Sequence, residues 1–133
     1  MIFIDSNVPV YLIGGPHAHK VDAQLMLEGL VAGKRRLVCD AEVLQEIPLR
    51  YSAIGRRESI SPAMNVLPAI VDEVFPIERQ DVLRAATIVA GKESHSARVA
   101  LHIAVMERHG IETIFSFDRD YDRRPGLVRI APV

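Results

Sequence analysis

Short runs of apolar residues, rich in β-branched and aromatic side chains, recur along the chain between polar segments. Such runs are typical of strands buried within a sheet. They predict strands over residues 1–4, 37–39, 74–77, 113–117 and 127–130. Three of these runs are followed at once by an aspartate, namely Asp5, Asp40 and Asp118. Because Pro76 cannot donate a ladder hydrogen bond, its strand is expected at an edge of the sheet.

Between these runs the apolar residues recur at three- and four-residue steps, the spacing of helices that cover a sheet. The pattern predicts helices over residues 8–13, 20–33, 41–54, 61–71, 82–90 and 97–109, with a turn over 16–19. Asp81 and Ser96 are expected to cap the last two helices. The final helix is apolar nearly all round and should be central and buried. Strands that alternate with helices imply a parallel sheet with right-handed crossovers, and therefore an α/β domain.

The helix after Asp40 carries an acidic residue that local structure does not explain. Asp40 suits the N-cap of this helix, and the helix dipole favours Glu42 in its first turn. Glu46 lies beyond that turn among apolar residues, and Pro48 predicts a local kink beside it. We therefore interpret Asp40 as a cap, whereas Glu46 needs another explanation.

Composition says more about the size and location of the protein than about any reaction it catalyses. At 133 residues the chain fits one domain, residues 1–133, and 49% hydrophobic residues is ordinary for a globular protein. Lys and Arg number 16 against 17 Asp and Glu, so any basic surface for nucleic acid must be local. The single Cys39 excludes an intramolecular disulfide, and no leader or membrane-spanning run is evident. These features predict a cytoplasmic protein with no membrane association.

The strand-end carboxylates suggest a metal site. In a parallel sheet Asp5 and Asp118 would share one rim, where charges ~4 Å apart repel by about 4 kcal/mol at an effective dielectric of about 20. A divalent cation relieves this repulsion, and carboxylates suit Mg²⁺ or Mn²⁺. Zinc would call for His and Cys at ligand spacing, whereas His17 and His19 lie in the expected turn and are interpreted as surface residues. Spacing alone leaves open that Asp5 only caps the following helix.

Four segments together resemble the PIN-domain ribonucleases of the VapC toxin type. They are residues 3–7, 40–47, 96–106 and 116–121, in the family's order and across nearly the whole chain. The resemblance implies a single-domain, three-layer α/β/α sandwich with a mostly parallel sheet. It also implies a Mg²⁺-dependent endoribonuclease, usually a homodimer, that a cognate antitoxin protein inhibits by inserting a segment into the acidic groove.

The resemblance also assigns residues to the site. Asp5, Glu46 and Asp118 match three acidic family positions, and Asp120 is an auxiliary candidate ligand. Ser116 matches the small hydroxyl residue before the last acid, and Ser6 follows the first acid within the matching run.

The chain departs from the family at Val99, where the resemblance leads one to expect an acid. With Ser96 as N-cap, position 99 is the third helical residue, where a carboxylate would complete a capping box. A natural pseudoenzyme, a branch using other ligands and an inactivating substitution made for safe production all remain open, and we favour the last. Val99 therefore predicts an impaired nuclease.

The sequence also suggests RNA contacts for the nuclease and an alternative function. Five arginines are candidate phosphate contacts for RNA: Arg56, Arg57, Arg119, Arg123 and Arg124. The alternative function is a catalytically dead PIN-like module that binds a partner peptide or RNA, which Val99 favours. A phosphoacceptor receiver domain is discounted, because the strand at 74–77 ends in Glu78-Arg79 and no lysine follows a later strand.

Overall fold

The fold is built on a five-stranded parallel sheet with the order β3-β2-β1-β4-β5. It is seen in a computed structural model that describes residues 1–15 and 17–132. The strands are β1 (Ile2–Ile4), β2 (Leu37–Asp40), β3 (Glu73–Phe75), β4 (Thr113–Phe115) and β5 (Val128–Ile130). The three residues of β1 are at most 1% exposed, so the strand that leads to Asp5 is the centre of the sheet.

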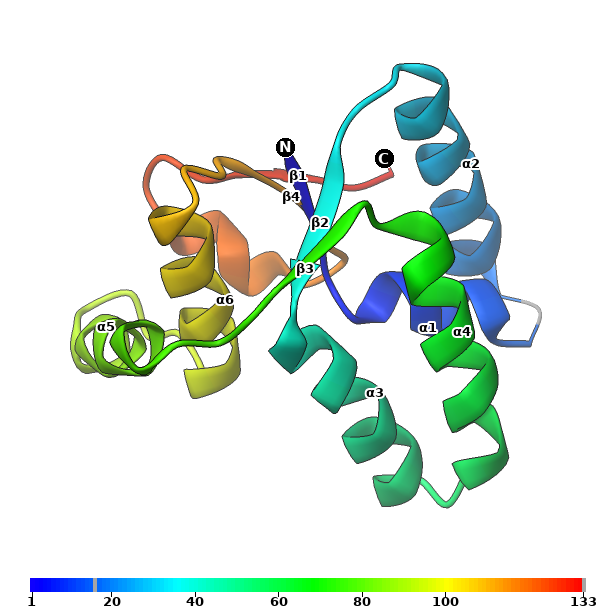
Figure 1. The fold of residues 1–133 in the computed structure, drawn as a ribbon, viewed down its shortest axis with the longest axis horizontal. Helices are drawn as coiled ribbons and strands as arrows, with labels where there is room; N and C mark the ends of the chain where they lie inside the picture. The colour runs from blue at the N-terminus through cyan, green and yellow to red at the C-terminus, as the bar shows by residue number, and fades with distance from the viewer. Residues whose placement is uncertain (16, 133) are drawn as a thin grey trace.

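Six α-helices surround the sheet. They are α1 (Asn7–Ile13), α2 (Ala18–Ala32), α3 (Ala41–Ala53), α4 (Ile60–Ile70), α5 (Arg79–Ala90) and α6 (Ala97–Arg108). Two short 3₁₀ helices complete the described elements, η1 (Arg57–Ser59) and η2 (Arg119–Arg123). Figure 1 shows α5 and α6 on one side of the sheet and α1, α2 and α4 on the other. The predicted three-layer α/β/α sandwich is therefore confirmed.

The apolar helix α6 is largely buried, as its sequence predicts. Its buried residues are Val99, Ala100, His102, Ile103, Ala104, Val105 and Met106. The helix begins at the predicted cap, because the Ser96 hydroxyl accepts a hydrogen bond from the Val99 N–H at 3.2 Å. It ends before Gly110, whose φ of 67° is a conformation that glycine adopts without strain.

The predicted starts of α5 and α4 are wrong. Helix α5 begins at Arg79 instead of Val82, because Glu78 is its N-cap and Asp81 is the third helical residue of a capping box. Helix α4 begins at Ile60 instead of Ser61. Pro62 then falls within the first turn, where a missing N–H costs nothing because that N–H has no helical acceptor.

The turn expected over residues 16–19 is also shorter than predicted. Helix α2 begins at Ala18, with His17 as its N-cap: the imidazole Nδ1 accepts a hydrogen bond from the His19 N–H at 3.0 Å. Pro16 lies outside the described residues. The remaining boundary changes are small: β4 stops at Phe115 and β5 begins at Val128. As expected from Pro76, β3 is an edge strand.

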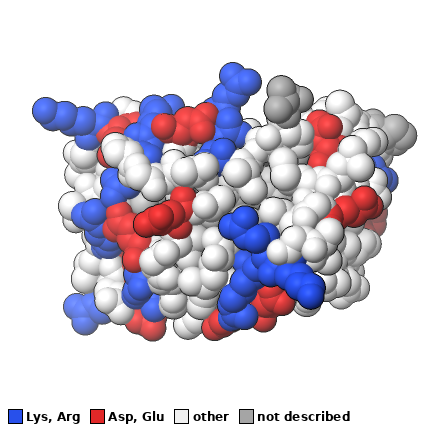
Figure 2. All heavy atoms as spheres, turned by 90° about the horizontal axis from the view of Figure 1, so that it is seen from above, with Lys and Arg blue, Asp and Glu red and all other residues white. Residues whose placement is uncertain are grey.

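The face of the molecule drawn in Figure 2 shows no large field of one sign. On the face in Figure 2, basic and acidic side chains are interspersed and separated by neutral surface. This agrees with the formal net charge of −1. No helix among the described residues is long and apolar enough to cross a membrane.

Candidate metal centre

Three acidic side chains from distant parts of the sequence meet at the carboxyl end of the sheet. Asp5 follows the central strand β1, Glu46 lies in the second turn of α3, and Asp118 is the N-cap of η2 after β4. Asp5 is fully buried and Glu46 is 5% exposed, whereas the Asp118 side chain is 29% exposed. The order of the strands brings Asp5 and Asp118 together because β1 and β4 are neighbours.

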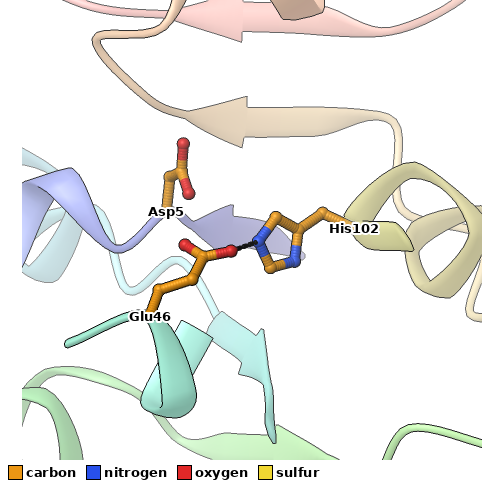
Figure 3. A group of neighbouring side chains, drawn as sticks. All are labelled: Asp5, Glu46 and His102. Carbon is orange, nitrogen blue, oxygen red and sulfur yellow. Dashed lines mark hydrogen bonds and ion pairs between the residues drawn. The ribbon is translucent and has the colours of Figure 1, made fainter. Parts of the chain in front are cut away.

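A buried histidine that sequence reasoning missed lies beside these acids. His102 of α6 contacts Asp40 Oδ2 through Nδ1 at 2.8 Å and Glu46 Oε1 through Nε2 at 2.6 Å. One ligand atom each from Asp5, Glu46 and His102 lies within 4.8 Å of the others. Figure 3 shows the three side chains approaching from separate elements, with the imidazole directed at Glu46.

The charge of His102 decides its chemistry. Burial lowers the pKa of the imidazole, but the charges and hydrogen bonds of Asp40 and Glu46 outweigh burial and raise it to about 10. His102 is therefore an imidazolium that donates from both nitrogens, and it keeps no lone pair for a metal. Only a neutral imidazole binds a cation, so with His102 protonated the carboxylates are the groups here that could hold a metal ion.

A second cation, Arg98, lies among the three predicted acids. Its guanidinium is 2.9 Å from Asp118 Oδ2, 3.4 Å from Glu46 Oε2 and 3.7 Å from Asp5 Oδ1. Although burial lowers the arginine pKa, the charges of Asp5 and Glu46 raise it further above its already high value. The three carboxylates thus converge on one cationic group, and the Arg98 side chain is 38% exposed.

Hydroxyl and amide groups fix the acids in place. Ser116 donates from Oγ to Asp5 Oδ2 at 2.6 Å, and Ser6 donates from Oγ to Glu46 Oε2 at 2.5 Å. Asn7 donates from Nδ2 to Asp5 Oδ2 at 3.4 Å and to Ser116 Oγ at 3.3 Å. These bonds hold both carboxylates toward the rim, so the two serines orient the acids.

The surroundings of the two buried acids, Asp5 and Glu46, shift their pKa values in opposite directions. Burial raises the pKa of Asp5, and the opposing effects of His102 and Ser116 do not cancel it. Burial also raises the pKa of Glu46, but hydrogen bonds from His102 and Ser6 outweigh it and leave that pKa below its usual value. Glu46 is therefore the carboxylate that its surroundings keep ionised.

One orphaned polar atom bears on whether a hydrated metal ion fits this site. Tyr121 is fully buried, and its hydroxyl has no hydrogen-bond partner among the described residues. Burial raises the phenol pKa, and the nearby charges of Asp5, Glu46 and Asp118 raise it further. A buried hydroxyl in such a place is expected to be satisfied by water. Three converging carboxylates and one such hydroxyl suit a hydrated hard cation such as Mg²⁺ or Mn²⁺.

Asp120, the auxiliary candidate, is directed away from the three acids. Its Oδ1 is 2.7 Å from Nδ1 of the buried His95 and also pairs with Arg123, and its Oδ2 accepts from the Ser96 N–H at 3.4 Å. The Asp120 N–H donates to Asp118 Oδ1 at 2.9 Å, which orients that acid. In this structure Asp120 links the start of α6 to η2.

The arginines singled out for RNA differ in their surroundings. Arg124 pairs with Glu93 and Glu107, and Arg123 donates to the carbonyl oxygens of residues 93 and 94 as well as to Asp120. Arg56 pairs with Glu58 and stays largely exposed, at 64%. Arg57 and Arg119 are exposed. Binding RNA through Arg123 or Arg124 would therefore require existing ion pairs to break.

Val99 faces the core and adds no polar atom to the site. It is 0% exposed and belongs to the main hydrophobic cluster. In the sequence it lies next to Arg98 and three residues before His102, so all three share the first turns of α6.

Arg98, His102, Asn7 and Tyr121 are the neighbours that sequence reasoning did not assign. The four-residue step from Arg98 to His102 puts both on one face of α6, and this was the available signal. It could not be interpreted without knowing that α3 and β1 face that side.

Comparisons with known proteins agree on one family. The PIN domain profile matches residues 2–127. The chain is 54% identical over 131 residues to ribonuclease VapC13 of Mycobacterium tuberculosis, across 98% of this chain and 100% of that relative. The crystal structure of M. tuberculosis VapC20, described as a Sarcin-Ricin loop cleaving toxin, matches with a TM-score of 0.76 at 24% identity, across 99% of this chain and 100% of VapC20.

A toxin-antitoxin complex from Klebsiella pneumoniae contains a chain that matches with a TM-score of 0.66 at 15% identity, across 96% of both chains. At these identities, VapC20 and the Klebsiella chain bear on the fold alone.

Proposed function

The chain belongs to the PIN-domain family, among the VapC ribonucleases, and from this premise we propose that it is the metal-dependent endoribonuclease toxin of a toxin-antitoxin pair. Mg²⁺ or Mn²⁺ is the cofactor in this proposal. The observation that carries it is the convergence of Asp5, Glu46 and Asp118 on a single cationic group. A place where one cation is stabilised by three carboxylates suits a divalent ion equally well.

Asp5, Glu46 and Asp118 would hold the ion at the carboxyl end of β1 and β4. When bound, a divalent ion of this kind activates water toward a phosphodiester and stabilises charge on the leaving oxygen. Ser116 and Ser6 keep Asp5 and Glu46 in the orientation in which their oxygens face the rim.

The two cations of α6 would have separate tasks. His102 holds its protons on Nδ1 and Nε2 between Asp40 and Glu46, and so keeps Glu46 ionised and in place. Arg98 is partly exposed and can turn from the acids toward a phosphate, because guanidinium binds both kinds of oxygen. The exposed Arg56, Arg57 and Arg119 stay candidates for more distant phosphates.

The partners we propose are an RNA substrate, a cognate antitoxin and a second copy of the chain. A hollow of about 270 Å³ beside Glu46 and Arg98 is lined by Ser6, Asn7, Leu49, Arg50 and Ala53 as well. Its lining combines apolar side chains with Glu46, Arg50 and Arg98, and we propose that a segment of the antitoxin inserts there. Co-expression with the neighbouring reading frame should therefore yield a copurifying complex. The reducing cytoplasm stays our prediction for its location, in keeping with the free, buried Cys39.

The nuclease proposal is tested with total RNA and Mn²⁺, after purification from any partner. The chain and its Val99→Asp variant are compared with the same two proteins carrying Asp5→Asn. Cleavage that Asp5→Asn abolishes, in either background, supports the proposal, because a contaminating nuclease would be unaffected by that substitution. The absence of cleavage from both Val99 and Val99→Asp proteins would contradict it.

Val99 favours a second candidate function, a PIN-like module that binds a partner peptide or RNA without cleaving it. The isopropyl group offers no ligand, and Arg98 and His102 already neutralise part of the acidic charge. This candidate predicts that the chain copurifies with its partner yet stays inactive when position 99 carries an acid.

A further inference from the structure

Four aromatic side chains gather beside the acidic rim, and the nuclease chemistry does not use them. They are Tyr11 of α1, His17 and His19 at the start of α2, and Phe117 between β4 and η2. Ring centroids lie 5.0 Å apart for Tyr11 and Phe117 and 4.5 Å apart for His19 and Phe117. His17 lies on Tyr11 with centroids 5.5 Å apart and ring planes 19° apart. Tyr11 therefore already accepts a flat ring in parallel contact.

These rings are tied directly to the acids. Phe117 lies between Ser116 and Asp118, and its N–H donates to Asn7 Oδ1 at 3.3 Å. The other end of the same amide donates to Asp5 Oδ2 at 3.4 Å. Two hydrogen bonds through Asn7 thus join the aromatic cluster to the buried Asp5. Phe117 is also the residue directly before Asp118.

The cluster is only partly required by the core. Phe117 packs against the hydrophobic core, whereas Tyr11 is not among the hydrophobic side chains packed on it. Tyr11, His19 and Phe117 are half-buried, and His17 is exposed. A half-exposed set of rings beside a site for phosphodiester chemistry is the usual composition of a surface on which unpaired bases stack.

We propose that Tyr11 and Phe117 form a stacking platform for an unpaired nucleobase of RNA, next to the proposed metal site at Asp5 and Asp118. The inference rests on the proposed nuclease function and assigns Tyr11 and Phe117 to the binding of its RNA substrate. The base takes the place of the exposed His17 against the Tyr11 ring. Because every base has a flat face, the platform supplies affinity with little sequence preference. Such affinity matters here because the chain has a net charge of only −1, and the face in Figure 2 shows no broad basic field.

The test measures binding in EDTA, so that cleavage does not interfere, by fluorescence anisotropy of a labelled single-stranded oligoribonucleotide. Tyr11→Leu and Phe117→Leu should each weaken binding by roughly tenfold, the loss expected for one stacked base. Tyr11→Phe keeps the ring and should bind within about twofold of the parent. Leu83→Ala removes an exposed apolar side chain of α5 and serves as the control for general surface effects. Circular dichroism confirms that each variant is folded.

A second arm uses an oligonucleotide series in which one nucleotide at a time is abasic. At one position the parent should lose affinity by about the same factor as Tyr11→Leu, and there the variant should show no further loss. Parent-like binding by both leucine variants would overturn the platform while leaving the nuclease proposal standing. If the parent neither binds nor cleaves RNA, both fall. Loss of antitoxin copurification with unchanged RNA affinity would assign the rings to the protein partner and also overturn the proposal.

Discussion

At the scale of single residues, Arg98 sets the charge balance of the acidic site. It contacts Asp5, Glu46 and Asp118, and a divalent ion held by these carboxylates would have to compete with the guanidinium. Removing it leaves three carboxylates facing one another. Arg98→Met should therefore raise the affinity for Mn²⁺ on the order of tenfold, measured by calorimetric titration.

The matched control for Arg98→Met is Arg50→Met, which removes an exposed arginine that lines the adjacent hollow. This variant should leave the Mn²⁺ affinity unchanged. Equal affinities for all three proteins would mean that Arg98 does not compete for the ion.

Val99 is the residue at which activity and stability are expected to diverge. Because its side chain is fully buried, Val99→Asp places a carboxylate in the hydrophobic core. Without metal this should lower the free energy of unfolding by about 1–3 kcal/mol, against a small gain from the helix dipole. With Mn²⁺ much of the loss should be recovered, and RNA cleavage should appear. Urea unfolding with and without Mn²⁺ measures the first effect, and a gel assay measures the second.

Val99→Asn separates charge from shape. It matches the size of aspartate but carries no charge, so it should be destabilised with and without Mn²⁺ and should stay inactive. Cleavage of equal rate by the Val99, Asp and Asn proteins would show that position 99 takes no part in the chemistry.

At the scale of elements, the ion pair between Arg108 and the buried Asp81 joins α6 to α5. Arg108 near the end of α6 donates from Nε to Asp81 Oδ1 at 2.7 Å and from Nη2 to Asp81 Oδ2 at 2.9 Å. Asp81 also accepts from the Glu78 N–H at 2.8 Å, and its side chain is 1% exposed. One carboxylate therefore serves both as the first-turn cap of α5 and as the link to α6.

Asp81→Asn should lower the free energy of unfolding by about 1–3 kcal/mol at neutral pH, because Arg108 then loses its bidentate partner. Burial raises the Asp81 pKa, but the bonds from Arg108 and Glu78 outweigh it and leave that pKa below its usual value. A carboxylate with a lowered folded-state pKa stabilises the fold above its unfolded-state pKa of about 3.9, and this stabilisation is lost as pH falls through the folded-state value.

Urea unfolding of the parent and Asp81→Asn proteins should therefore differ most at neutral pH and converge in acid below about pH 4. The exposed Glu112→Gln serves as a control with little expected effect. A difference that stays constant from neutral to acidic pH would show that the charge of Asp81 is not the cause.

The sequence predicts a helix or strand boundary correctly where neighbouring residues determine it. It does not do so where the boundary depends on contacts that only the folded structure shows. The apolar run that ends at Asp5 and the Ser96 cap are both properties of a few neighbouring residues, and the structure has them where the sequence places them. The start of α5 was missed because Glu78 and Asp81 both suit a cap. Only the bond from the Glu78 N–H to Asp81 shows that the helix begins earlier.

The candidate site likewise contains residues that the sequence identified and residues that it did not. Asp5 and Asp118 follow from strand ends and sheet topology, and Glu46 was noticed because no local role explained it. His102 looked like one polar residue in an apolar helix, since its partners Asp40 and Glu46 are more than fifty positions away in sequence. Arg98 could equally have been a solvated surface residue until α6 was placed against β1.

At the scale of the whole molecule, side chains of the protein itself neutralise part of the negative charge of the acidic rim. Four carboxylates, Asp5, Asp40, Glu46 and Asp118, are matched by only two cations, Arg98 and His102. We expect these two cations to offset enough repulsion for the chain to fold without metal. The remaining negative charge keeps an attraction for a divalent ion. Folding and metal binding are therefore expected to be separable in this protein.

This separation predicts how stability responds to metal. In EDTA the chain should give the same far-ultraviolet circular dichroism as with Mn²⁺ and should unfold in one cooperative transition. Added Mn²⁺ should raise the free energy of unfolding with the logarithm of its concentration, reaching about 2.7 kcal/mol at about one hundred times the Kd, because the ion binds only the folded state. Thermal unfolding across a Mn²⁺ series measures this. Asp5→Asn should remove the response without unfolding the chain, because the amide keeps the hydrogen bond from Ser116. Loss of the fold in EDTA would show instead that Arg98 and His102 do not suffice to balance the acids, and that metal binding and folding are a single event.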